Sequence, residues 1–151
     1  MKVRQIIQRE IQIKLVVPFE TSVETTDLRR IILIEADVDG VIGWGECVAA
    51  ETPSYSPETV DTAWHIQRDF LWPLLKDKEF VSAGDVWGLF EHVRGHNMAK
   101  GAIEAAIWDA EARQKNLPLW KLLGGVPGKS LSRNGLGARR TASGRPGAWR
   151  D

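Results

Sequence analysis

The sequence predicts an α+β domain, in which a three-stranded antiparallel meander is followed by a bundle of three to four helices. Apolar residues alternate with a period of two up to about residue 48 and recur at helical spacing from residue 56 onward. Asp39-Gly40 separates two of the alternating runs. Such a two-residue link is typical of a tight hairpin, because a type I′ turn needs positive φ at both positions. Strands followed by helices favour helices packed on one face of a small sheet.

Three alternating runs, over residues 2–15, 28–38 and 41–48, predict the strands. In each run most of the apolar residues named below stand an even number of positions apart, as expected of a strand with one buried face. The apolar faces comprise Val3, Ile7, Ile11, Ile13 and Leu15 in the first run, Leu28, Ile32, Ile34, Ala36 and Val38 in the second, and Ile42, Trp44 and Val48 in the third. We expect these faces to pack against the helices.

The first two helices are recognised by their ends. Ser56-Pro57-Glu58 predicts a helix start with Ser56 as the N-cap, and Trp72-Pro73 predicts its end. A second helix is expected to begin at Ser82, where Asp85 stands three residues later in a variant of the capping box.

The third and longest helix is expected over about 98–115. Its alanines form a small-residue face that allows close packing against the meander: Ala99, Ala102, Ala105, Ala106 and Ala110. Pro118 then opens a short helical turn that Gly124-Gly125 ends.

The last part of the chain has a different composition. Residues 124–151 hold six basic residues, one acidic residue and seven glycines, so their net charge is +5, whereas residues 1–123 carry −5. The segment follows neither period, and we expect a disordered basic tail over 126–151. Its charge would also suit a nucleic-acid arm, but it lacks interleaved aromatic residues and a positively charged folded body, so no nucleic-acid partner is predicted.

Three groups are candidates for chemistry. His92 and His96 stand four apart, which on a helix would suit a zinc site, but a surface or capping role is favoured because no third ligand is evident. Cys47 is interpreted as a small buried hydrophobe. Glu46 shares a face with apolar residues, so it either needs a partner or marks the mouth of a site. No phosphate loop, catalytic triad or paired-carboxylate motif is present in the sequence.

Two loops attract attention as binding elements. One spans 18–23 and joins the first two strands, and the other spans 50–55 and joins the third strand to the first helix. Each combines apolar groups with small hydroxyl residues. They are interpreted either as simple turns or as two lips over a ligand.

Several motifs carry a family resemblance. The segments GWGECV at 43–48, YSPETVDTAWH at 55–65 and MAKGAIEAAIWDAEARQKNLPLWKLLGG at 98–125 resemble the N-terminal capping domain of the enolase superfamily, in its mandelate racemase/muconate lactonizing group. LVVPFETS at 15–22 and RGHNMAKGA at 94–102 are similar to the o-succinylbenzoate synthase/N-acylamino acid racemase subgroup.

The resemblance implies a reaction and a lid. The family abstracts a proton alpha to a carboxylate, using barrel lysines and a divalent metal, Mg2+, to stabilise the enediolate. Those groups belong to a barrel that follows the capping domain, so no catalytic residue and no metal ligand is predicted in this chain. By resemblance, the substrate-binding residues are Phe19, Val23, Ala50 and Tyr55, although Ala50 stands where Met is common.

We therefore interpret residues 1–125 as a capping domain whose barrel is missing. The composition of 126–151 suggests a frameshift near Val126-Pro127, or else a genuine basic terminus. The chain alone is expected to be inactive, cytoplasmic and without a membrane partner. A small-molecule carboxylate would be its substrate only if a barrel is present, and its exposed barrel-docking face is expected to self-associate. The alternative is a stand-alone α+β binding module.

Overall fold

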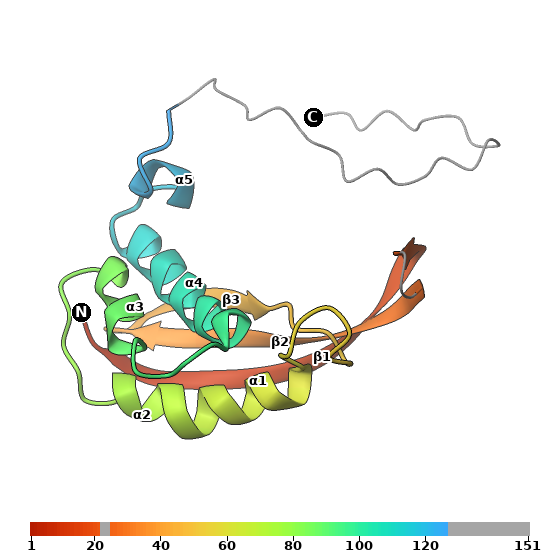
Figure 1. Cartoon of the computed structure of the whole chain (residues 1–151). Coiled ribbons are helices and arrows are strands. Elements are labelled where there is room, and N and C mark those ends of the chain that lie inside the picture. The colour runs from red at the N-terminus through yellow and green to blue at the C-terminus, as the bar shows by residue number, and fades with distance from the viewer. Residues whose placement is uncertain (22–24, 127–151) are drawn as a thin grey trace.

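The computed structural model describes residues 1–21 and 25–126 and contains the predicted antiparallel meander. Strands β1 (Val3–Glu20), β2 (Thr25–Val38) and β3 (Val41–Cys47) form one sheet in the order β1-β2-β3 (Figure 1). Asp39 and Gly40 have φ of 52° and 91°, so the hairpin between β2 and β3 has the predicted positive φ at both positions. Val23 and the predicted tail from residue 127 onward lie outside the described residues.

The first loop was placed too early by the sequence. Pro18 and Phe19 belong to β1, and Phe19 pairs with Thr26 of β2. The register shifts between Lys14 and Phe19, so that residues 15–18 stand opposite Asp27 alone. Such a bulge accommodates Pro18 inside a strand, because its missing N–H is not needed by a regular ladder there.

The helices cover one face of the sheet, as predicted (Figure 1). The first three helical segments are consecutive in sequence and form one rod, which crosses beneath the sheet in Figure 1. The segments are α1 (Val60–Ile66), π-helical η1 (Gln67–Leu71), α2 (Trp72–Leu75), 3-10 helix η2 (Ala83–Asp85), α3 (Val86–Leu89), α4 (Asn97–Gln114) and α5 (Leu119–Leu122). The capping box of Ser82 and Asp85 is confirmed.

The ends of the first helix differ from prediction. Thr59, not Ser56, is the N-cap, because the Thr59 hydroxyl accepts a hydrogen bond from the Thr62 backbone N–H. The helical rod also continues past Trp72-Pro73 to Leu75. The π-helical turn before Pro73, in which Trp72 N–H bonds to the Gln67 carbonyl, offers room for a proline that a regular helix interior would not accept.

The buried face of β3 is also the opposite of the one expected. Cys47, Gly45 and Gly43 pair with Ile32, Ile34 and Ala36, which are fully buried beneath the helices. Ile42, Trp44 and Glu46 therefore lie on the other face of the sheet, where Trp44 is 43% exposed. In β1, Ile7, Ile11 and Ile13 also lie on this second face, because a register shift after Val3 reverses the alternation.

Glycines on β3 explain this choice of face. A Cβ at Gly45 would lie 2.0 Å from the Ala102 carbonyl oxygen of α4, and a Cβ at Gly43 would lie 2.0 Å from that of Ala106. The backbones of β3 and α4 are thus in direct contact. The predicted small-residue face of α4 is confirmed for four alanines, while Ala105 is exposed.

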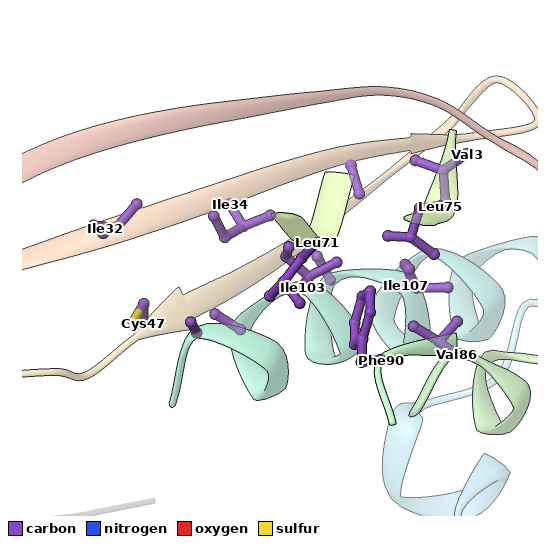
Figure 2. Close-up of a cluster of buried hydrophobic side chains, with 14 of the residues drawn as sticks. Val3, Ile32, Ile34, Cys47, Leu71, Leu75, Val86, Phe90, Ile103 and Ile107 are labelled. Atoms are coloured by element: carbon purple, nitrogen blue, oxygen red, sulfur yellow. The ribbon is translucent and has the colours of Figure 1, made fainter. Parts of the chain in front are cut away.

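A single apolar core fills the space between sheet and helices (Figure 2). Figure 2 shows side chains from the sheet and from the helices meeting there: Ile32, Ile34, Cys47, Leu71, Leu75, Val86, Phe90, Ile103 and Ile107. Every buried hydrophobic residue of the described chain lies between Val3 and Ala112. Among the described helices, none has the length and apolar character that crossing a membrane requires.

Candidate functional site

A cavity of about 640 Å³ opens at the end of the sheet where β1 ends and β2 begins. Three parts of the chain meet there: the paired ends of β1 and β2, the segment that follows β3, and the first turn of α4. The lining residues are Gln12, Phe19, Thr25, Thr26, Asp27, Leu28, Arg29, Arg30, Val48, Ala50, Glu51, Thr52, Tyr55, Ser56 and Met98.

The structure brings the two predicted lips together. Phe19, Ala50 and Tyr55 all line this cavity, although 31 residues of sequence separate the first two. Phe19 is 51% exposed and Tyr55 is 88% exposed, so both rings present apolar surface to solvent. Val23, the fourth predicted site residue, lies outside the described residues. Aromatic rings at the rim of a cavity are suited to contact and desolvate a small ligand.

The second lip extends to residue 56, because Ser56 also lines the cavity, and this segment of residues 50–56 is tied to the sheet and to α1. Ala50 forms an isolated parallel bridge with Thr59, and its carbonyl accepts a hydrogen bond from Val60 N–H at 2.9 Å. At the lip's start, the Arg29 guanidinium donates to the Val48 carbonyl at 3.1 Å. The segment therefore has fixed ends, and Tyr55 is exposed near the second of them.

Glu58 connects this lip to α4. Its carboxylate is buried, with 6% of the residue exposed, and accepts hydrogen bonds from the backbone N–H groups of Met98 and Ala99, at 3.1 and 3.0 Å. The sequence placed this acid at the start of α1, but its charge acts at the start of α4. A carboxylate there is stabilised by free N–H groups and by the positive end of the helix dipole.

One of the two arginines that line the cavity, Arg30, is paired with acidic neighbours. Arg30 donates to Glu10 at 2.8 Å and to Asp61 at 3.0 Å. The hydrogen bond from Arg30 lowers the pKa of the Glu10 carboxyl, and the same two acids raise the pKa of the Arg30 guanidinium. Arg30 therefore joins β1, β2 and α1 and has little capacity left for a ligand's carboxylate.

The candidate catalytic groups of the sequence do not assemble into a site. His92 lies in a turn and His96 precedes α4, so the two do not share a helical face. Cys47 is buried, as predicted, and burial raises the pKa of its thiol. Glu46 is exposed, so its carboxylate does not require a partner. It is not among the residues that line the cavity, so it does not mark the mouth of this site.

These residues also do not fit a metal ion. Within residues 1–21 and 25–126, no three His, Cys, Asp or Glu side chains come together as possible ligands. A hard divalent cation such as Mg2+ prefers several oxygen ligands. What the described site provides is a shaped, partly apolar surface that can contact a ligand and exclude water.

Sequence reasoning missed several cavity residues. Arg29 and Met98 are cavity residues that the sequence does not indicate. Arg29 lies near one end of β2 and Met98 is the second residue of α4, and neither position carries a local signal for a site. Met98 falls within RGHNMAKGA, a segment that carries the family resemblance.

Comparison with known proteins gives a consistent family. The family model described as "Mandelate racemase / muconate lactonizing enzyme, N-terminal domain" matches residues 3–124. The o-succinylbenzoate synthase of Geobacillus kaustophilus is 43% identical over 125 residues, which are 82% of this chain and 33% of that protein. The N-succinylamino acid racemase of an Amycolatopsis species is 40% identical over 126 residues, covering 83% of this chain and 34% of that protein.

The fold is shared with solved structures. A member of the enolase superfamily from Listeria innocua superposes with a TM-score of 0.79 at 31% identity, over 83% of this chain and 34% of the other. A muconate lactonizing enzyme from Pseudomonas fluorescens, solved with muconolactone, gives a TM-score of 0.76 at 26% identity, over 82% of this chain and 34% of that one. The chain spans about a third of the length of the curated relatives it matches.

Proposed function

The chain belongs to the mandelate racemase/muconate lactonizing enzyme family through its N-terminal domain, and from this membership we propose that it caps the substrate site of an o-succinylbenzoate synthase/N-succinylamino acid racemase-like enzyme. The capping-domain fold and the superfamily resemblance expected from the sequence are confirmed. The observation that carries the proposal is the cavity, where Phe19, Ala50 and Tyr55 meet at the open end of the sheet.

In this role the chain's own residues contact and enclose the substrate. The two exposed rings, Phe19 and Tyr55, would pack on a small-molecule carboxylate held in a barrel and would exclude water from it. The reaction proposed for the whole enzyme is proton abstraction alpha to that carboxylate. Mg2+ and the acid–base groups would come from the barrel part, because the described residues offer no ligand set for a metal.

A chimera tests this proposal directly. Residues 1–125 would replace the matching segment of the Geobacillus kaustophilus enzyme, and o-succinylbenzoate formation would be measured with magnesium. Within residues 1–21 and 25–126, all buried hydrophobic residues lie before residue 113, so this segment carries its own core. We expect turnover by the chimera, and at least about a ten-fold loss of kcat/KM in Phe19→Ala and Tyr55→Ala, because each change removes an apolar contact of the pocket.

Phe70→Ala is the matched control. Phe70 is 49% exposed, close to the 51% of Phe19, but it lies on η1, where its ring contacts His65 edge to face at 5.4 Å. Its kcat/KM should equal that of the parent chimera. A folded chimera without turnover, or equal losses in all three variants, would instead favour the stand-alone α+β binding module.

We also propose a cytoplasmic location and self-association of the isolated chain. The lone cysteine fits a reducing compartment. Self-association is supported by large apolar side chains that remain exposed, including Tyr55, Trp87 at 42% and Trp120 at 47%. Sedimentation velocity of the 151-residue chain tests this, and a monodisperse monomer at all concentrations would contradict it.

A further inference from the structure

Glu58 is a buried carboxylate that lies outside the apolar core and takes no acid–base part in the proposed function. Burying a charge is unfavourable unless its oxygens are hydrogen-bonded. Both oxygens are satisfied, Oε1 by Met98 N–H at 3.1 Å and Oε2 by Ala99 N–H at 3.0 Å. The side chain thus binds two consecutive backbone groups of a helix that begins 39 residues later in the chain.

Helix α4 needs this outside acceptor. His96, its own N-cap residue, has a left-handed backbone with φ of 54°, and within the described residues its side chain makes no capping hydrogen bond. The first N–H groups of a helix have no partner inside the helix. Glu58 supplies the cap that His96 does not.

The two ends of this connection both reach the cavity. Met98, whose N–H binds the Glu58 carboxylate, is itself a lining residue of the cavity. Ser56 also lines the cavity, and its hydroxyl accepts a hydrogen bond from the Glu58 N–H at 3.1 Å. Tyr55 is the next residue of the lip. Glu58 therefore links two walls of the cavity that are distant in sequence, through its carboxylate on the α4 side and through its backbone N–H on the lip side.

We propose that Glu58 is a positioning residue, which sets the lip of residues 50–56 against the first turn of α4 and so holds the cavity in its ligand-binding shape. The proposal that Glu58 holds the lip against α4 rests on the hydrogen bonds alone. Its kinetic consequence rests on the proposed function. Loss of the connection leaves the cavity correctly shaped for only a fraction of the time, which weakens apparent binding by that same fraction.

Glu111 provides a matched control. It is a second buried carboxylate, 1% exposed, that accepts a hydrogen bond from a backbone N–H, that of Ala83 at 2.8 Å. It lies near the other end of α4 and does not line the cavity. Glu58→Gln and Glu111→Gln therefore make the same chemical change at two buried carboxylates that bind backbone N–H groups. Glu111 also pairs with the Lys115 ammonium, so its variant loses an ion pair in addition, and only the Glu58 variant touches the lip.

The first test uses the full 151-residue chain and needs no enzymatic activity. With methyl-labelled methionine the chain gives two signals, from Met1 and Met98. In Glu58→Gln we expect the Met98 signal to move or broaden and exchange of the Val60 amide, which binds the Ala50 carbonyl, to become about ten-fold faster. In Glu111→Gln both should match the wild type. Equal changes in the two variants would overturn the positioning role.

The second test measures KM and kcat in the chimera. Glu58→Gln should raise KM about ten-fold with kcat within about two-fold, because the loss is in binding-competent population and not in chemistry. Glu58→Asp, which keeps the charge, should restore part of the difference and serves if Glu58→Gln does not fold. The inference would be contradicted if kcat of Glu58→Gln fell as strongly as its KM rose. It would also be contradicted if Glu111→Gln raised KM as much as Glu58→Gln does. An inactive parent chimera would refute the proposed function while leaving the first test to decide on Glu58.

Discussion

The carboxylate of Asp109, on α4, accepts a hydrogen bond from the backbone N–H of Trp44, on the edge strand β3, at 2.9 Å. Strand β3 pairs only with β2 in the described sheet, so this N–H points to the outer edge. The Arg113 guanidinium donates to the same carboxylate at 2.9 Å. A helix side chain thus satisfies one N–H of an edge strand, the kind of group through which a further strand pairs.

Asp109→Ala should destabilise the domain by about 1–2 kcal/mol, because the Trp44 N–H loses a charged acceptor. Arg113→Ala is the control. It keeps the Trp44 bond and removes a mostly exposed ion pair, which is worth about 0.3–0.5 kcal/mol. Urea unfolding of the three proteins gives the free energies, and amide exchange at Trp44 should accelerate in Asp109→Ala alone. Identical exchange in both variants would show that the bond does not protect the edge.

Gly45→Ala should be among the most destabilising single changes. Its Cβ would meet the Ala102 carbonyl oxygen at 2.0 Å, and that oxygen belongs to helix backbone that cannot move aside easily. We expect a loss of about 3 kcal/mol. Gly101→Ala, inside α4, has no atom within 4 Å of the new Cβ and should stabilise by about 0.5–1 kcal/mol. Thermal unfolding of both variants tests the contact, and a harmless Gly45→Ala would mean that β3 and α4 are further apart.

The position of the first N-cap can be tested by two hydroxyl deletions. Thr59→Ala removes the acceptor of Thr62 N–H and should cost about 1 kcal/mol. Ser56→Ala removes only the acceptor of Glu58 N–H, outside the helix, and should cost less. Free energies of unfolding from urea titration decide the order. The reverse order would restore Ser56 as the cap.

Stability on the acid side should depend on Glu10. Its hydrogen bond from Arg30, which is 20 residues away and so absent in the unfolded chain, lowers its pKa in the folded state. The contribution is therefore fully present above the usual carboxyl pKa and is lost as pH falls through the lowered value. Carboxyl NMR titration should show the Glu10 midpoint below that of an ordinary glutamate. Arg30→Gln should return it to the usual range, while Arg29→Gln, whose parent side chain binds the Val48 carbonyl, should not.

Local sequence was sufficient for the kind and order of the elements. The period of two, the Asp39-Gly40 link and the Ser82–Asp85 capping box involve residues within a few positions of one another, so their conformations were predictable and are confirmed. The resemblance of residues 98–125 likewise predicted the family. The helix at Asn97–Gln114 falls within one residue of its predicted bounds.

Only the tertiary structure decided which faces and partners these elements use. The sequence predicts the alternation of β3 but not its core face. That face is the one with Gly43 and Gly45, because α4 lies so close to the strand that no side chain fits between them. The same limit applies to Glu58, whose partners are 40 and 41 residues away, and to the cavity that gathers Phe19, Ala50 and Tyr55. Periodicity reports which residues share a face, whereas packing between distant segments determines what that face touches.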